Sequence, residues 1–285
     1  MGHILIKDLN KGFIEQSKKQ SMGHVIIKNL NKEFIDRRKK SRCRSDAVPK
    51  HNRIPVLDNI NLEFLNGEMV CILGPSGCGK STLLRIVAGF DNAFSGNVLI
   101  DGKAHSGPSS DHIFVFQHSS LFPWMTVKEN VELGLRAMKD QEEKEEKIQE
   151  YIDIVDLGGF EMHYPHQLSG GMQRRAELAR ALAVNPDILF MDEPFSGLDF
   201  LTHMRAREEV VNVHQFIGIT MLIVTHDIDD ALVMGDRIIV FSSRPARVKM
   251  ARKLDFPRPR DFEKQPELNE LRSEIFLMLG VPHAV

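Results

Sequence analysis

The sequence of 285 residues lacks several features that would place it in common protein classes. No apolar run approaches the roughly 18 residues that a membrane-spanning helix needs, and the N-terminus has no apolar core of a secretory signal. Cysteine is scarce: Cys43, Cys71 and Cys78 form neither a paired set nor a metal-ligand spacing. The formal net charge is only −2, which identifies no nucleic-acid partner. We therefore expect a soluble cytosolic protein with free thiols.

The charge that is present is unevenly distributed. Residues 1–53 contain fourteen Lys and Arg against five Asp and Glu, so a basic N-terminal part precedes an acidic remainder. Within it, residues 36–55 are polar and broken by Pro49 and Pro55, which predicts a long loop between two strands. We interpret the basic part either as a solvated loop or as a contact with anionic lipid headgroups.

The first strand-like segment occurs twice, because residues 1–14 recur as residues 22–35 with few changes. Two copies are too few for a solenoid. We interpret residues 1–21 as a duplicated N-terminal extension, which reflects a local duplication or a start codon upstream of the true start at Met22. The alternative is that the first copy adds an edge strand through its apolar residues 4–6.

From Val56 onward, short apolar runs alternate with helical stretches. Continuous apolar runs of this length suit strands of a sheet that is covered on both faces. The predicted strands are residues 69–73, 113–116, 187–191, 220–224 and 238–241. The predicted helices are residues 80–88, 128–137, 172–184 and 201–216, and the charged stretch 140–150 is interpreted as a solvated helix face. The alternation predicts an α/β domain.

A glycine-rich segment lies between the first of these strands and the first helix. Residues 74–81 read Gly-Pro-Ser-Gly-Cys-Gly-Lys-Ser and match G-x-x-x-x-G-K-[ST] in the strand-to-helix context that this pattern requires. Glycines let backbone N–H groups approach an anion, and the helix start adds the positive end of its dipole. We predict that Lys80 neutralises the β- and γ-phosphates of ATP and that the Ser81 hydroxyl ligates Mg²⁺. The predicted ATP-binding residues here are Gly74, Pro75, Ser76, Gly77, Cys78, Gly79, Lys80, Ser81 and Thr82.

Two further predicted strands end in residues suited to phosphoryl chemistry. The run 187–191 leads into Asp192 and Glu193, and the run 220–224 leads through Thr225 to His226. Ligands collect at the carboxyl ends of parallel strands, so these side chains are expected beside the phosphate cradle. We assign Asp192 to Mg²⁺ through water, Glu193 to the attacking water and His226 to the γ-phosphate.

A second anion-binding pattern precedes the helix predicted at residues 172–184. Residues 168–175 read Leu-Ser-Gly-Gly-Met-Gln-Arg-Arg, and small residues at a helix start make an anion site. Since the first cradle already holds the phosphates of one nucleotide, this second site calls for a second nucleotide. With these motifs in this order, the chain from about residue 22 to its end resembles the ABC ATPase family. The resemblance implies that Ser169, Gly170, Gly171 and Gln173 contact ATP held by a facing subunit.

The resemblance implies roles for three more residues. Gln117 matches the glutamine that touches Mg²⁺ and the attacking water in the family and responds to the permease, so it joins Glu193 and His226 as a catalytic residue. Asp199 matches the D-loop aspartate that contacts the opposing cradle. Phe34 matches the aromatic residue that stacks on adenine, although Phe13 occupies the same place in the first repeat copy.

The resemblance also implies the architecture. It predicts an α/β P-loop NTPase core with a mostly parallel sheet, an antiparallel β subdomain and an inserted α-helical subdomain. The ATPase domain is expected at residues 22–255, with the helical subdomain at about 90–165. Residues 256–285 are expected to form a C-terminal tail with a short helix.

Three segments, at residues 121–127, 243–248 and 256–261, resemble the branch of nitrate, sulfonate and taurine importers. The implied function is ATP hydrolysis that drives import of a small anion such as nitrate, sulfonate, taurine or bicarbonate. The implied partners are membrane permease subunits, a second copy of the chain or a homologous ATPase subunit, and an extracytoplasmic substrate-binding protein, with the chain on the cytoplasmic face of the inner membrane.

Two observations leave alternatives open. The order Met-Gln-Arg-Arg after the signature is similar to that of some lipid-trafficking ABC ATPases, so a lipid-transport or export system is the alternative function. A nucleic-acid ABC machine is disfavoured by the single signature and the lack of sustained heptads. Trp124, the one tryptophan, is interpreted either as a permease anchor or as a core residue of the helical subdomain.

Overall fold

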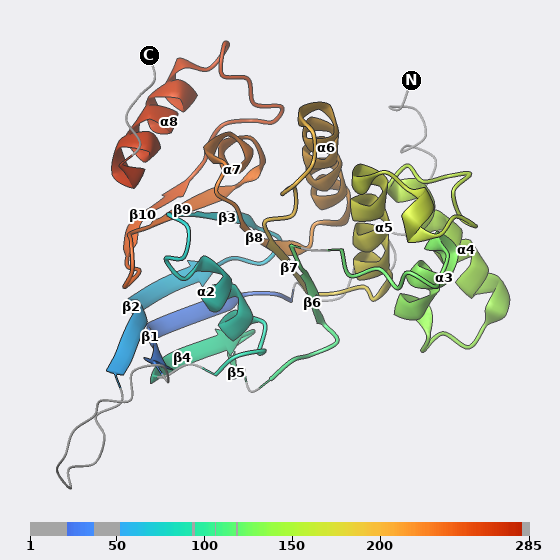
Figure 1. Ribbon diagram of the computed structural model, residues 1–285, viewed down its shortest axis with the longest axis horizontal. Helices are drawn as coiled ribbons and strands as arrows, with labels where there is room; N and C mark the ends of the chain where they lie inside the picture. The colour runs from blue at the N-terminus through green and yellow to red at the C-terminus, as the bar shows by residue number, and fades with distance from the viewer. Residues whose placement is uncertain (1–21, 37–51, 93–94, 106, 118, 281–285) are drawn as a thin grey trace, which may run out of the picture.

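The computed structural model describes residues 22–36, 52–92, 95–105, 107–117 and 119–280, which form two sheets and the helices around them (Figure 1). The first repeat copy at residues 1–21 lies outside the described residues, so the edge-strand alternative stays untested. Most of the basic loop predicted at residues 36–55 also lies outside the described residues, because the description stops at Asp36 and resumes at Asn52.

The larger sheet has six strands in the order β10-β9-β3-β8-β7-β6. Its central strands run parallel, while β10 pairs antiparallel with β9. Every residue of β3, β7 and β8 is buried, as expected for a sheet covered on both faces. The five strands predicted for this sheet are confirmed, with bounds that shift by at most one residue. The strands are β3 (Met69–Leu73), β6 (His112–Val115), β7 (Ile188–Asp192), β8 (Thr220–Val224), β9 (Arg237–Phe241) and β10 (Val248–Lys253).

The smaller sheet is the expected antiparallel β subdomain, with strands in the order β2-β1-β4-β5. Its strands are β1 (Val25–Asp36), β2 (Asn52–Phe64), β4 (Ser95–Ile100) and β5 (Lys103–Ala104). Helix α2 (Lys80–Val87) packs between the two sheets. Its buried Leu83 and Leu84 share one apolar cluster with Ile27 of β1 and Ile72 of β3. The helix that leaves the phosphate cradle is thus anchored on both sides.

A group of helices lies at one end of the larger sheet, beside β6 and β7 (Figure 1). It contains α3 (Val127–Glu132), α4 (Gln141–Ile154) and α5 (Gly170–Ala183), with short 3₁₀ turns at Leu133–Leu135 and Pro165–Gln167. The helical subdomain therefore begins later than the predicted residue 90, because residues 95–115 supply β4, β5 and β6 to the two sheets.

Two local predictions for this region need adjustment. The helix predicted at residues 128–137 is interrupted by the 3₁₀ turn, where Gly134 lies so close to α5 that an added Cβ would come within 2.7 Å of Ala183. The charged stretch 140–150 does form α4, yet Ile148, Tyr151 and Ile152 of this helix are buried. The helix therefore packs one apolar face against its neighbours and keeps most of its charges on the other, while the buried Lys144 pairs with Glu132 of α3.

Three helices cover the other part of the larger sheet: α6 (Phe200–Ile217), α7 (Ile228–Met234) and α8 (Pro266–Leu279). The predicted C-terminal tail does contain a helix, and this helix is docked rather than free. Leu268, Leu271 and Ile275 of α8 are buried, and each such burial contributes about 1.5–3 kcal/mol. Arg272 adds a two-bonded ion pair with Asp229 of α7, at 2.6 Å for both bonds.

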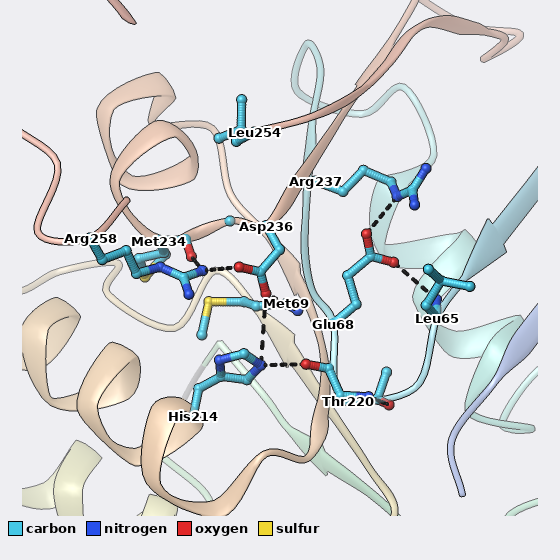
Figure 2. Close-up of polar contacts among 12 residues, drawn as sticks. Leu65, Glu68, Met69, His214, Thr220, Met234, Asp236, Arg237, Leu254 and Arg258 are labelled. Atoms are coloured by element: carbon cyan, nitrogen blue, oxygen red, sulfur yellow. Dashed lines mark hydrogen bonds and ion pairs between the residues drawn. The ribbon is translucent and has the colours of Figure 1, made fainter. Parts of the chain in front are cut away.

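A buried polar network joins α6, the start of β3 and the C-terminal segment (Figure 2). The ring Nε2 of His214 donates to the Gly67 carbonyl oxygen at 3.0 Å. Asp236 accepts from the Met69 amide at 2.9 Å and pairs with Arg258 at 2.7 Å. Burial lowers the pKa of His214, with the neighbouring Arg258 acting in the same direction and Asp236 against it. Burial therefore outweighs the interactions with Asp236 and Gly67 and favours a neutral imidazole.

Among the helices that the structure describes, none combines the length and apolar composition that a membrane crossing requires.

Candidate functional site

The segment after β3 forms a loop that requires glycine at two points. Gly77 and Gly79 have φ values of 73° and 127°, the left-handed side that favours glycine. A Cβ on Gly79 would lie 2.9 Å from side-chain carbons of Val56 and Leu57, so the loop packs tightly against β2. It continues directly into α2 at Lys80. Residues 74–82 thus form the strand, loop and helix start that a phosphate cradle needs.

Two side chains of the cradle, those of Lys80 and Cys78, are buried. The Lys80 side chain is buried, and its Nζ donates to the carbonyl oxygens of Gly74 at 2.7 Å and Pro75 at 3.2 Å. An anionic phosphate is a stronger partner for an ammonium than two carbonyl groups, so these bonds are exchangeable for a ligand. Cys78 is buried, and burial raises the pKa of its thiol, so only its backbone can face a nucleotide.

Ser81 and Asp192 meet at the end of β7. The Ser81 hydroxyl donates to Asp192 Oδ1 at 2.9 Å, although the two residues are 111 positions apart in the sequence. Burial raises the pKa of Asp192, and the bond from Ser81 opposes that rise. A hydroxyl and a desolvated carboxylate at one point are oxygen donors of the kind that Mg²⁺ prefers. The donor set therefore fits the predicted magnesium ion.

Glu193 occupies a strained backbone position immediately after β7. Its φ is 48°, a left-handed conformation that costs a non-glycine residue about 1–3 kcal/mol. The amide of Glu193 donates to the Val224 carbonyl oxygen of β8 at 2.8 Å, which holds the turn in place. This turn directs the Glu193 carboxylate away from the buried strand and toward two other predicted residues.

Those two residues are Gln117 and His226. Gln117 Nε2 lies 3.4 Å from Glu193 Oε2 and 3.2 Å from Ser196 Oγ. His226 Nδ1 lies 3.4 Å from the same Glu193 oxygen, and the imidazole is largely exposed. The structure therefore brings together the three residues predicted as catalytic, each from the end of a different strand.

The signature segment forms the start of α5. Ser169 caps the helix by accepting from the Met172 amide at 3.3 Å. An added Cβ on Gly171 would lie 2.3 Å from Thr202, which explains a glycine here. In the part of the chain that the structure describes, no hydrogen bond joins Ser169, Gly170 or Gly171 to the cradle at residues 74–82. A single chain does not unite its two anion sites.

Gln173 bonds to its own chain in this structure. Its Nε2 donates to the carbonyl oxygens of Pro165 at 2.9 Å and Leu168 at 3.2 Å. The amide thus supports the turn that leads into α5. Contact of Gln173 with a second nucleotide stays a prediction.

Asp199 and Phe34 are both exposed, so the partners predicted for them can reach their side chains. Asp199 caps α6, with its carboxylate accepting from the Thr202 amide at 3.2 Å, and hydrogen bonds from Thr202 lower its pKa. The Phe34 side chain in β1 is exposed, and the Lys32 ammonium lies 5.1 Å from its ring centroid. Stacking on adenine stays a prediction.

One residue beside the cradle was not predicted. Arg244 donates from its guanidinium to the Gly77 carbonyl oxygen at 2.6 Å, so a cation stands at the edge of the phosphate loop. The β9–β10 hairpin that carries it is joined to β2 by the backbone bonds of Ala246 to Val56 and Asp58. In the sequence, residues 243–248 indicated only a transporter branch. Their distance from the cradle along the chain concealed the contact.

A group of acids and a histidine lies behind His226. Both carboxylate oxygens of Asp230 lie 2.8 Å from His203 Nε2, and Arg207 approaches one of them at 3.4 Å. Asp227 lies close enough to complete a metal-ligand group, yet its carboxylate already accepts from the Asp230 amide as the cap of α7. The bonds of His203 and Arg207 to Asp230 give the group a structural role: they join α7, which follows His226, to α6.

An exposed aromatic surface occurs on the helical region. Trp124 is 69% exposed, which excludes the interpretation that it is a core residue. Its ring centroid lies 5.4 Å from that of Phe122. The segment containing Phe160 and Met162 borders the same helix start, since the amides of residues 127 and 128 donate to the carbonyls of residues 163 and 161. We call the exposed side chains of Phe122, Trp124, Phe160 and Met162 the Trp124 surface.

Comparison with protein families and curated proteins gives consistent matches. A family model described as ABC transporter matches residues 57–196. The aliphatic sulfonates import ATP-binding protein SsuB of Bacillus cereus is 43% identical over 219 residues, which cover 76% of this chain and 86% of that protein. The nitrate import ATP-binding protein NrtD of Synechocystis is 40% identical, covering 81% and 91%. The taurine import ATP-binding protein TauB of Pelagibacter ubique is 39% identical, covering 81% and 90%.

Solved structures agree with these matches. The ATP-binding cassette MJ0796, in a dimeric post-hydrolysis state bound to ADP and Pi, has a TM-score of 0.66 and 34% identity, covering 82% of this chain and all of that chain. The protein cbiO1 of Clostridium perfringens, described as part of an ABC transporter complex, has a TM-score of 0.69 and 27% identity, covering 90% and 95%. The arrangement of strands and helices is therefore that of an ABC ATPase cassette.

Proposed function

Because this chain belongs to the ABC transporter family as an ATP-binding subunit that hydrolyses ATP, we propose that it drives the import of a small anion through a membrane permease. The observation that carries the catalytic part is the meeting of Gln117 and His226 at one oxygen of Glu193, next to the Ser81–Asp192 pair. Phosphoryl transfer depends on holding such groups in fixed positions around the γ-phosphate.

We assign a separate task to each group. Lys80 and the backbone of residues 74–82 bind the phosphates and neutralise their charge. Glu193 accepts the proton of the attacking water at its carboxylate, and Gln117 orients that water through its side-chain amide. His226 stands where its ring can stabilise charge on the γ-phosphate.

Mg²⁺ fits the Ser81–Asp192 pair, and when bound it supplies positive charge to the phosphate oxygens. Ser81 offers its hydroxyl directly to the ion. Burial raises the pKa of Asp192. A cation in this position would hold its carboxylate in the charged form.

We propose that the complete site forms between two ATPase subunits, either two copies of this chain or this chain and a homologue. The support is the separation of the two anion sites in one chain, together with the dimeric state of the MJ0796 cassette. Ser169, Gly170 and Gly171 of one subunit would close over the triphosphate held by the other. Asp199 would lie at the same junction. Gln173 would join this contact only by exchanging its bonds to Pro165 and Leu168 for the nucleotide.

The Trp124 surface is our candidate for the permease contact. Large exposed aromatic side chains are typical anchors of protein interfaces. This surface lies on the helical region, close in the chain to Gln117, so occupation by a permease helix has a short path to the catalytic glutamate. Such a contact would place the chain on the cytoplasmic face of the membrane.

The imported substrate is proposed from the relatives. Sulfonate, nitrate and taurine, named for three of them, are small and carry an anionic oxygen group. This pattern favours import over the lipid-transport or export alternative. We propose an extracytoplasmic substrate-binding protein as the component that selects the anion, because an ATPase subunit does not contact the cargo.

Reconstitution tests this proposal. The permease that copurifies with the chain is placed in proteoliposomes with the chain, ATP and Mg²⁺, and uptake of labelled taurine, nitrate and an alkyl sulfonate is measured. We expect uptake of at least one anion to require ATP and to vanish with Glu193→Gln. Absence of uptake for all three anions, with stimulation by a phospholipid instead, would establish the alternative.

A further inference from the structure

One face of α5 holds the segment that carries Gln117. Arg174, Glu177 and Arg180 follow one another at intervals of three residues, which places them on one side of the helix. All three bond to residues that follow β6. Since α5 begins at the signature, capped by Ser169, the helix that starts with the signature is fastened further along to the catalytic glutamine.

Arg174 makes the central contacts. Its guanidinium donates to the carbonyl oxygens of Phe116 at 2.8 Å and Gln117 at 2.9 Å. Its Nε also donates to the carbonyl oxygen of Pro194, the residue directly after Glu193. One planar cation thus bridges the backbone of Gln117 and the backbone of Pro194, which follows Glu193.

Glu177 completes the bridge. Its carboxylate accepts from Arg174 at 2.6 Å through one oxygen and from the Ser120 amide through the other. The Glu177 side chain is 1% exposed and that of Arg174 is 11% exposed. Charges buried to this degree are costly unless they are paired, so the arrangement specifies one geometry. Arg180 adds bonds to the carbonyl and hydroxyl of Ser120, at 2.9 and 2.5 Å.

The placement has a mechanical consequence. Arg174 lies five residues beyond Ser169, about 7.5 Å along a continuous helix. A helix turn is stiff, because each residue is bonded to the turn before it. Movement of the signature end therefore carries the guanidinium with it, and the guanidinium carries the carbonyls of Gln117 and Pro194.

We propose that Arg174 is a positioning residue that aligns Gln117 with Glu193 according to the place of the signature helix. This inference rests on the proposed closure of two subunits over ATP. When the signature engages the opposing triphosphate, α5 is held in one place, and Arg174 holds the two catalytic side chains at their hydrolytic separation. When the signature is free, α5 is not held by that contact, so the alignment is maintained less strictly and water attack slows.

The chemistry of arginine is essential to this role. The guanidinium fork donates in several fixed directions within one plane, which matches carbonyl groups on two different segments and the carboxylate of Glu177. A lysine ammonium carries the same charge but lacks this fixed geometry. Substitution by lysine should therefore retain the charge balance and lose the alignment.

Kinetics of three variants of the full chain test the proposal: Arg174→Lys, Arg174→Gln and Arg175→Gln. Arg175 is the matched control, since it is the next residue of α5 and bonds to Asp156 and Glu209, away from Gln117. We expect both Arg174 variants to lower kcat about 10- to 100-fold while KM for ATP changes less than about threefold. Arg175→Gln should retain kcat within about threefold.

A second readout separates alignment from stability. Each Arg174 substitution is combined with Glu193→Gln, and ATP-dependent dimer formation is measured by light scattering. We expect the dimer to form, because the signature contacts are intact. Should Arg174→Gln fail to fold, the double variant Arg174→Gln/Glu177→Gln removes both buried charges together and is expected to fold with the same low kcat.

The outcomes distinguish this inference from the proposed function. If the unaltered chain does not hydrolyse ATP, the proposed function fails. If it does, and Arg174→Lys keeps normal kcat, the positioning role is overturned. Equal losses of kcat in the Arg174 and Arg175 variants, in step with lower melting temperatures, would likewise overturn it in favour of a purely structural salt bridge.

Discussion

At the catalytic edge of the larger sheet the predicted chemical groups are held by protein partners, whereas the helical region exposes large apolar side chains. Lys80, Ser81 and Glu193 each have bonding partners within the cradle and at the ends of β7 and β8. Trp124 and Met162 are 69% and 70% exposed. One region is arranged for chemistry that tolerates little displacement, and the other for contact with a partner.

The residues predicted to position ATP and the exposed surface proposed to contact a partner therefore lie in different regions of this fold. The catalytic edge is preorganised by a parallel sheet that is buried on both faces. The helical region packs on the sheet through the apolar side chains of α5, and polar bonds centred on Arg174 link α5 to the catalytic edge. Substitutions in the two regions should therefore have different effects on ATP turnover, partner binding and stability.

The largest expected effect is at Glu193. Glu193→Gln removes the general base and should lower ATP turnover about 10²- to 10⁴-fold, while ATP binding persists and ATP-bound dimers accumulate. Phosphate release and gel filtration in the presence of ATP measure the two results. Glu208→Gln, an exposed glutamate on α6, is the control. Normal turnover by Glu193→Gln would show that Glu193 is not the general base. It would also weaken the contrast between a catalytic edge and a partner-binding helical region.

The next effect concerns the metal. Asp192→Asn keeps the shape of the side chain but removes the charge that fits Mg²⁺, so the apparent affinity for Mg²⁺ should fall about 10- to 100-fold. Turnover measured against Mg²⁺ concentration at saturating ATP reports this shift. An unchanged Mg²⁺ dependence would show that the Ser81–Asp192 pair is only a structural hydrogen bond.

Trp124 tests the other side of the comparison. Trp124→Ala should weaken permease binding by about 2 kcal/mol, roughly 30-fold, because an exposed aromatic anchor is lost. Thermal stability and basal ATP turnover should stay unchanged. Leu277→Ala, with an equally exposed side chain on α8, is the control for surface apolarity. A lower melting temperature without a loss of permease binding would contradict the assignment.

The smallest effect concerns pH and lies in neither region. Burial lowers the pKa of His214, so the unfolded chain binds the proton more readily than the folded chain. The resulting stability is present above about pH 6.5, the ordinary histidine value, and is lost as the pH falls through the lowered value. Urea unfolding between about pH 7.5 and 5.5 should show a smaller loss for His214→Gln. Equal losses would indicate that other groups govern acid sensitivity.

Much of the catalytic edge was predictable because its residues lie at the ends of apolar strands. The pattern around Gly74–Ser81 specifies a local loop, and Asp192, Glu193 and His226 each follow a strand whose carboxyl end must lie at the same edge. The helical subdomain was less predictable. Its start was placed too early because β4 and β5 are short and largely exposed, so that alternation of apolar runs alone does not reveal them.

The sequence by itself determined the fold class and predicted the catalytic groups, because strand periodicity and glycine-dependent turns are local properties of the chain. Only the tertiary structure decided which side chains meet. It gave Gln173 to its own turn, Arg244 to the edge of the cradle and Arg174 to the backbone of both Gln117 and Pro194. The physical reason is that long polar side chains bond wherever packing places an acceptor, and that placement depends on segments far apart in the sequence.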